Sequence, residues 1–119
     1  NIGFADPALG PAGRANVTTA ADCAIALHAV STRPALAPLR TAMRSSLFNS
    51  RILALLPDDV VVAHKTGTLS GVVNDIGVIH ASTGDFTACF LTDAQPDPPA
   101  TAQAIARCAL AAHDAWQAR

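Results

Sequence analysis

The chain has 119 residues, of which half are apolar and only 14% are charged, so its composition is that of one folded domain and excludes a disordered chain. Its net charge of −1, with scattered arginines and few aromatic residues, argues against nucleic acid as the main partner. No apolar run is long enough to span a membrane, and the first residues lack the basic start and apolar core of a signal peptide.

The chain opens with a segment rich in glycine, proline and asparagine, residues 1–17, which is predicted to be a loop. A helix is expected to follow it. The hydroxyl of Thr19 can accept a free backbone N–H, and Asp22 places negative charge at the positive end of the helix dipole. This helix should end near Ser31, and its predicted buried face is Ala20, Cys23, Ala24, Leu27 and Val30.

A second helix is expected from Pro38, because proline is favoured in the first turn of a helix. Asn49-Ser50 should end it, so the segment 18–56 as a whole is predicted to be helical. The residues expected on the apolar side of this second helix are Leu39, Met43 and Leu47.

From Val60 onward β-branched residues crowd together and the apolar period becomes that of strands. Two short connections, at Ser70-Gly71 and 82–85, predict an antiparallel meander of three strands within residues 57–93. Both faces of the third strand carry apolar residues, so both faces of the sheet should need cover. The predicted strands are 60–68, 72–81 and 86–92, and Phe86, Ala88 and Phe90 are expected to share one face.

The last predicted element is a helix over residues 97–119. Asp97 can cap it, and the two prolines that follow are tolerated in its first turn. Its apolar stripe should lie across the sheet. The order of helices, three strands and a final helix predicts an α+β fold, a three-stranded antiparallel sheet with flanking helices. The residues of the predicted stripe are Ile105, Ala109, Ala112 and Trp116.

The three cysteines, Cys23, Cys89 and Cys108, are far apart and have no C-x-x-C spacing. We interpret them as small buried hydrophobic residues, with a disulfide or a reactive thiol as the alternative. The four histidines show no metal-ligand spacing, either with one another or with the cysteines. No metal site is therefore expected.

Lys65 is the only lysine of the chain, and it stands where an apolar strand gives way to Thr66-Gly67-Thr68. This stretch offers an ammonium group, two hydroxyl donors and a glycine with no Cβ to block the approach of a ligand. Such groups suit an extended ligand that carries a carboxylate and an amide and lies along the edge of the strand. Three residues alone occur often by chance, so the hypothesis depends on their setting.

Residues 16–119 resemble the C-terminal part of a class A serine β-lactamase, or of the wider family of penicillin-recognising serine hydrolases. The matching pieces are "NVTTAAD" at a helix start, "RILALLPDDVVVAHKTGTLSG" leading into the K-T-G box, "VVNDIGVI" as the next strand, and the closing helix. The resemblance implies an incomplete β-lactamase/transpeptidase-like fold. It also implies a hydrolase that needs no cofactor and a periplasmic or secreted location.

The same resemblance implies roles for five residues. Lys65 corresponds to the catalytic lysine that supports the proton network around the nucleophile and attracts the substrate's carboxylate. Thr66 supplies a hydroxyl to that carboxylate, and Gly67 lets the substrate approach. Thr68 falls where the family uses a backbone N–H of the oxyanion hole and, in many members, a hydroxyl on the carboxylate. Arg51 matches an arginine behind the box in several members, and a solvated arginine at a helix end is the alternative.

The resemblance also bears on three further residues around the box. It gives Asn74 and Asp75 a mainly structural role. His64 replaces an acidic residue that is common before the box lysine, and this departure leaves the local acid–base chemistry open.

Other motifs of these enzymes are absent from the chain. No S-x-x-K and no S-D-N occurs, and there is no glutamate, so only Asp6 offers a carboxylate in the first 15 residues. We therefore expect the nucleophile to come from an N-terminal remainder. The third strand, at 86–92, should then be an unpaired edge with exposed apolar side chains. The chain is expected to pair with that remainder or to self-associate.

The expected function is part of a serine hydrolase that opens the β-lactam ring through an acyl-enzyme. One alternative is a D-alanyl-D-alanine peptidase, a penicillin-binding relative or an esterase of the same fold. Another is a non-catalytic binding module. The small-molecule partner is accordingly a β-lactam or a ligand that resembles D-Ala-D-Ala.

Overall fold

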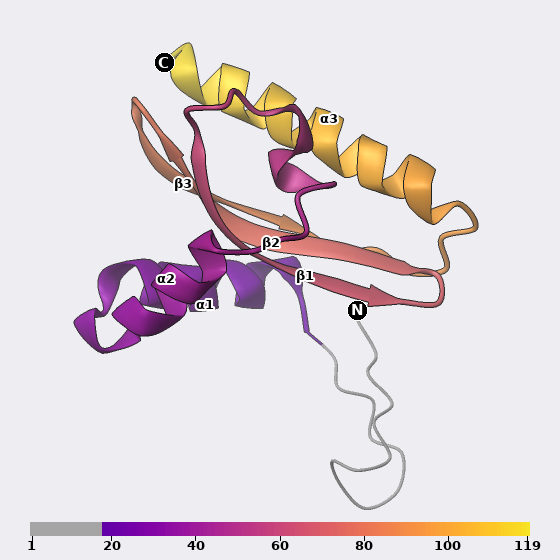
Figure 1. The fold of residues 1–119 in the computed structure, drawn as a ribbon, viewed down its shortest axis with the longest axis horizontal. Helices are drawn as coiled ribbons and strands as arrows, with labels where there is room; N and C mark the ends of the chain where they lie inside the picture. Colours follow the sequence, from indigo (N-terminus) through magenta and orange to yellow (C-terminus); the bar gives the residue numbers. More distant parts are fainter. Residues whose placement is uncertain (1–17) are drawn as a thin grey trace, which may run out of the picture.

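The computed structural model describes residues 18–119, so the predicted loop at 1–17 lies outside the described residues. Within them the structure confirms the α+β class (Figure 1). No helix of this part of the chain combines the length and apolar character needed to cross a membrane. The elements are α1 (Ala20–Thr32), the short 3-10 turn η1 (Pro34–Leu36), α2 (Ala37–Arg44), the 3-10 turn η2 (Ile52–Leu55), β1 (Val61–Leu69), β2 (Val72–Ala81), β3 (Gly84–Phe90) and α3 (Pro98–Gln117).

The three strands form one antiparallel sheet in the order β1-β2-β3. Gly71 makes the first turn with a φ of 69°, a left-handed conformation that favours glycine. β3 begins two residues before its predicted start, because Gly84 already pairs with Ala81 across the second turn. The register places Thr66 opposite Asp75, which brings the K-T-G box beside the N-D pair of β2.

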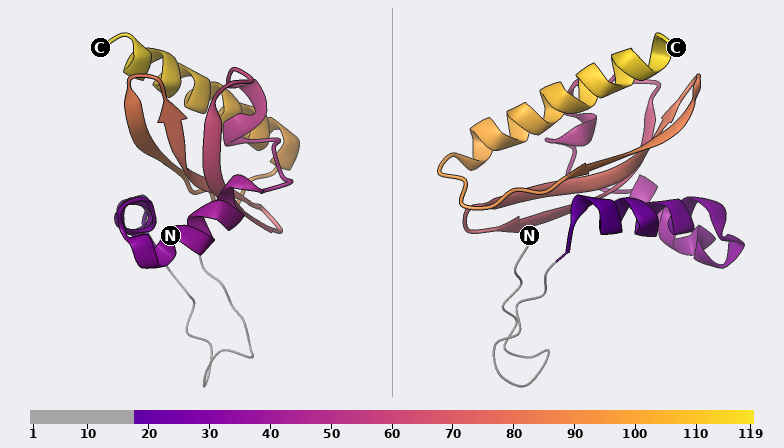
Figure 2. Two further views of the ribbon diagram at one scale, coloured as in Figure 1. Left: turned by 60° about the vertical axis from the view of Figure 1, so that its left-hand side comes forward. Right: turned by 180° about the vertical axis from the view of Figure 1, so that it is seen from behind.

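Helices cover both faces of the sheet, as the apolar pattern of the third strand indicated. Figures 1 and 2 show α3 over one face, with α1 and α2 beneath the other. Each face carries its own apolar core. The core on the α3 side is Ile52, Leu56, Val62, Val73, Ile79, Ala88, Ile105 and Ala109. The core on the α1 and α2 side is Leu27, Val30, Met43, Ala63 and Val78.

β3 shows the predicted alternation of its side chains. Phe86, Ala88 and Phe90 all belong to the core beneath α3, and Cys89 packs against the opposite core. Within residues 18–119 the outer edge of β3 pairs with no strand, as expected. Its phenylalanines, however, are half-buried rather than exposed, because α3 covers them.

Both long helices begin at the predicted caps. Thr19 Oγ1 accepts from the backbone N–H of Asp22 (3.1 Å), and Asp97 Oδ1 accepts from that of Ala100 (3.0 Å). The predicted faces need two corrections, because Ala20 and Ala112 are exposed. On α3 the position one turn after Ala109 is His113, and this histidine is buried where the prediction placed Ala112.

The apolar side predicted for the second helix is wrong except at Met43. α2 ends at Arg44, so Leu47 lies beyond the helix and cannot continue its face. Leu39, Leu47 and Phe48 are exposed, and together we call them the apolar patch. The interpretation of the cysteines also needs correction, because Cys108 is exposed while Cys23 and Cys89 are half-buried, and all three are free thiols.

Candidate functional site

The K-T-G box lies on an open edge of the sheet. It forms the second half of β1, and in the part of the chain that the structure describes β1 pairs only with β2. Lys65 and Thr68 are exposed, while Thr66 and Gly67 are half-buried. The ammonium of Lys65 donates a short hydrogen bond to the carbonyl of Thr66. The free edge therefore leaves these groups within reach of an extended ligand.

Arg51 lies behind the box, half-buried between β1 and β2. Its Nη1 donates to the carbonyl oxygens of Gly67 (3.2 Å) and Asn74 (2.5 Å). Its Nη2 donates to Oγ1 of Thr68 (2.5 Å). Because this bond occupies a lone pair of the hydroxyl, the Thr68 hydroxyl proton remains free for another acceptor. These three bonds tie the guanidinium of Arg51 to the strands that carry the box.

The charged side chains at the box, Lys65 and Arg51, are both positive. Among residues 18–119, no salt bridge has Lys65 or Arg51 as its cation. Asp75, the carboxylate directly across from Thr66, is fully buried and binds His64 on the α3 side of the sheet. The edge thus presents an unneutralised positive field, which favours a carboxylate ligand.

On the α3 side of the sheet, β1, β2 and the start of η2 meet at the carboxylate of Asp75. Nδ1 of His64 lies 3.0 Å from Oδ1 and 3.1 Å from Oδ2, and the backbone N–H of Ile52 donates to Oδ2 (3.1 Å). The resemblance implied a mainly structural role for Asp75, and the sequence analysis did not pair it with His64. The hairpin register supplies the missing signal, because it places both side chains on one face of the sheet.

An apolar pocket of about 300 Å³ adjoins the box on the α2 side. Its polar lining residues are Ser46, His64, Lys65 and Thr66. The rest of its lining comes mainly from α2 and the segment that follows it, and it includes Leu39, Met43, Leu47 and Phe48. The apolar patch therefore lies directly beside the candidate site.

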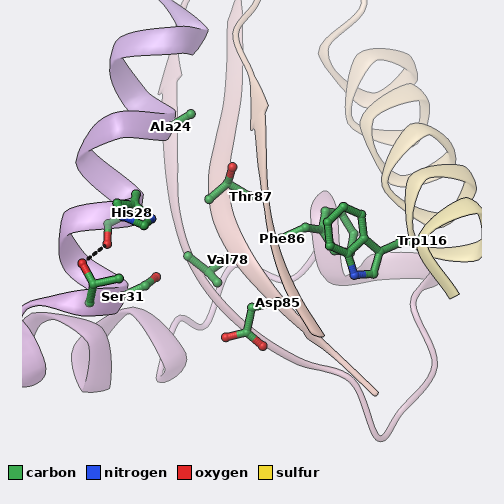
Figure 3. A pocket seen from close by; sticks show the side chains of 9 residues that line it. Ala24, His28, Ser31, Val78, Asp85, Phe86, Thr87 and Trp116 are labelled. Carbon is green, nitrogen blue, oxygen red and sulfur yellow. Dashed lines mark hydrogen bonds between the residues drawn. The ribbon is translucent and has the colours of Figure 1, made fainter. Parts of the chain in front are cut away.

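A larger pocket, of about 580 Å³, lies away from the box, at the outer edge of β3. Figure 3 shows His28 of α1 on one side of the sheet and Trp116 of α3 on the other, so this pocket curls around the strand. Trp116 stacks on Phe86 with ring centroids 5.1 Å apart, and its Nε1 donates to the carbonyl of Gly84 (2.9 Å). Among the described residues no lysine or arginine lines this pocket, so the box remains the candidate site for an anionic substrate.

The described part of the chain holds no cluster of metal ligands, and its Cys89 thiol has a raised pKa. No group of three or more His, Cys, Asp or Glu side chains there could hold a metal ion. Burial, and to a lesser extent the neighbouring Cys23, raise the pKa of the Cys89 thiol to about 11. Cys89 is therefore protonated at neutral pH and is not a ready nucleophile.

Comparison with known proteins gives consistent matches. Residues 3–116 match the model of the β-lactamase enzyme family, whereas no curated protein sequence matches the chain. The β-lactamase from Sphaerobacter thermophilus is 28% identical with a TM-score of 0.74, and the match covers 82% of this chain and 40% of that one. A variant of the last common ancestor of Gram-negative class A β-lactamases is 30% identical with a TM-score of 0.75, covering 90% and 44%.

A third solved structure shares the fold at lower identity. It is PBP-A as an acyl-enzyme complex with penicillin G, which is 21% identical with a TM-score of 0.74, covering 82% of this chain and 39% of that one. In all three comparisons the chain spans about two fifths of the length of the protein that it matches.

Proposed function

Because the chain belongs to the β-lactamase enzyme family, we propose that it is the part of a serine β-lactamase-like hydrolase that supplies the K-T-G wall of the substrate cleft. The observation that carries this proposal is the positive charge of Lys65, which has no salt-bridge partner and stands on an unpaired strand edge within residues 18–119, with Arg51 behind it. No serine of the chain stands in S-x-x-K, so the nucleophile is contributed from outside this sequence. By itself the chain is catalytically silent.

In the proposed complex the substrate lies along the free edge of β1. Its carboxylate binds at Lys65 and at the hydroxyls of Thr66 and Thr68, where Arg51 adds positive field without touching the substrate. Gly67 leaves room for the substrate's backbone, and the N–H of Thr68 forms half of the oxyanion hole. The nucleophilic serine attacks the β-lactam carbonyl, the ring C–N bond breaks, and water then hydrolyses the acyl-enzyme ester.

Two separate assays of the full-length protein test this proposal. The full-length protein is mixed with a chromogenic cephalosporin to measure turnover, and with a penicillin to detect a covalent adduct by mass spectrometry. Turnover of the cephalosporin supports a β-lactamase. If neither a colour change nor an adduct appears, the hydrolase proposal is overturned and a non-catalytic binding module takes its place.

The absence of glutamate from the chain favours a second candidate, a D-Ala-D-Ala peptidase or penicillin-binding relative, or an esterase, of the same fold. Class A enzymes use a glutamate to activate the deacylating water, so a protein without one would release its acyl group slowly. A penicillin adduct that persists without turnover would favour this candidate. The glutamate itself would be sought in the sequence upstream of Asn1.

The proposed partners and location follow from the proposed function. The N-terminal remainder of the protein, or a second copy of the chain, covers the apolar patch and the outer edge of β3. The complete protein is periplasmic or secreted, where β-lactams and peptidoglycan peptides are met.

A further inference from the structure

The carboxylate of Asp75 is one of the most deeply buried polar groups of the molecule. Asp75 is 0% exposed and His64 is 2% exposed. A carboxylate without partners at such a position would be strongly destabilising, and this one is stabilised by the His64 imidazole and the Ile52 N–H. Since a carboxylate only accepts, Nδ1 of His64 must carry the proton that it donates.

The two donors to the Asp75 carboxylate, His64 and Ile52, are sequence neighbours of the cations of the K-T-G site. His64 directly precedes Lys65 on β1, and Ile52 directly follows Arg51 at the start of η2. The carboxylate of Asp75 therefore holds the chain neighbours of both cations of the site. It does so on the α3 side of the sheet, where both side chains are buried, so neither His64 nor Asp75 is exposed to a ligand at the strand edge.

The local structure is closely packed around His64. Gly77 lies opposite His64, and a Cβ on Gly77 would come within 2.7 Å of His64 Cβ. In addition, Nε2 of His64 is buried without a hydrogen-bond partner among residues 18–119. An apolar side chain would avoid the cost of that unpaired nitrogen. The bond from Nδ1 to Asp75 is thus the polar contact that the imidazole contributes here.

We propose that His64 and Asp75 are positioning residues, which hold Lys65 and Arg51 in the mutual geometry that binds the substrate's carboxylate. This inference rests on the proposed function of the K-T-G site. Loss of the bond would let β1 and η2 shift relative to each other. Recognition of the carboxylate would then weaken, while the chemistry of the serine, which lies elsewhere, would change much less.

The experiment compares two amide substitutions of His64 in the full-length protein. His64→Asn keeps an N–H near the place of Nδ1, whereas His64→Gln moves its amide toward the place of Nε2 and leaves Asp75 without that donor. Each variant is assayed with a β-lactam and with the methyl ester of the same compound, which lacks the negative charge. If the protein forms an acyl-enzyme that does not turn over, the rate of adduct formation is measured against β-lactam concentration in place of KM and kcat.

The matched control is His113→Gln. His113 is likewise buried with an unpartnered Nε2, but it lies on α3, in a pocket with Val60 and His80 near the start of β1. Thermal unfolding of all three variants identifies any that do not fold. If His64→Gln does not fold, Asp75→Asn replaces it, because this change keeps the size of the side chain and removes the carboxylate.

We expect His64→Gln to raise KM for the β-lactam with its free carboxylate on the order of tenfold or more, and to change KM for the methyl ester less. His64→Asn should recover most of the loss, and His113→Gln should match the wild type. Equal losses for acid and ester, or no loss at all, would overturn the positioning role while the hydrolase proposal stands. If the wild type does not react with any β-lactam, the proposed function fails first and the positioning role fails with it.

Discussion

Lys65 carries the strongest functional prediction at the scale of single residues. Its charge is exposed on the free edge of β1 and has no salt-bridge partner within residues 18–119. In the full-length protein we expect Lys65→Ala to lower kcat/KM for a chromogenic cephalosporin by more than tenfold, about 1.4 kcal/mol of barrier or more. Arg107→Ala, at an exposed position of α3, is the control. An unchanged rate would refute the role assigned to Lys65.

Gly77 gives a prediction for stability. A Cβ at this position would lie 2.7 Å from His64 Cβ and 3.0 Å from the carbonyl of Ala63, closer than packing allows. Gly77→Ala should therefore destabilise the full-length protein by roughly 1–3 kcal/mol, as measured by denaturant unfolding. Gly67→Ala is the matched control, because its nearest contact would be an ordinary 3.7 Å to Asn74. Equal stability of the two variants would contradict this packing.

The cysteines give a prediction that depends on pH. Burial and Cys23 raise the pKa of Cys89 to about 11, so its thiolate is scarce at pH 8 and becomes more abundant as the pH rises toward that value. Alkylation with iodoacetamide should therefore label the exposed Cys108 before Cys89, and the rate at Cys89 should still be rising above pH 9. Peptide mapping measures both rates. Faster labelling of Cys89 at pH 8 would contradict its raised pKa.

The residues of the site were predictable from the sequence to different degrees. Lys65, Thr66, Gly67 and Thr68 follow one another on a recognisable strand, so they could be singled out directly. The contacts of Arg51 and the pairing of His64 with Asp75 could not be derived in the same way. They join segments 16 to 23 residues apart, or 11 residues apart across a hairpin, and they depend on its register.

At the scale of elements, the cap of α3 can be tested alone. Asp97 accepts from the backbone N–H of Ala100, one of the N–H groups that the helix leaves unpaired at its start. Asp97→Ala should lower the free energy of unfolding by about 1 kcal/mol. Asp58→Ala, an exposed carboxylate between η2 and β1, serves as the control. Indistinguishable unfolding curves for the two variants would argue against the cap.

The periodicity of the sequence predicted elements better than it predicted their ends and faces. The β-branched run and its two short turns gave the three-stranded meander, because both signals are local. Leu47 continued an apolar pattern past Arg44, where the chain leaves the helix. On α3 the buried position fell on His113 rather than Ala112, because packing against the sheet selects the face and composition alone does not.

At the scale of the whole molecule, the described fold leaves apolar and hydrogen-bonding surface without a partner. Both outer strands of the sheet are unpaired within residues 18–119, and the apolar patch is exposed beside the box. Unpaired edges and exposed apolar patches favour association. The 119-residue chain, produced alone, should therefore self-associate.

Light scattering over a dilution series, together with binding of a hydrophobic dye, measures this association. A stable monomer that persists on dilution and binds little dye would contradict the prediction. Leu47→Ser together with Phe48→Ser removes most of the exposed patch and should reduce dye binding. A variant with the same dye binding as the wild type would place the association elsewhere.

The stacking of Trp116 on Phe86 also provides an optical reporter. Trp116 is the only tryptophan of the chain, and it lines the pocket that curls around the outer edge of β3. Its ring lies under the guanidinium of Arg119, 3.4 Å from the centroid, while its Nε1 is bonded to the hairpin at Gly84. A strand that covered this edge would exclude water from one indole. The wavelength of the ultraviolet emission of Trp116 would then report, without any label, that a fourth strand has paired with the sheet.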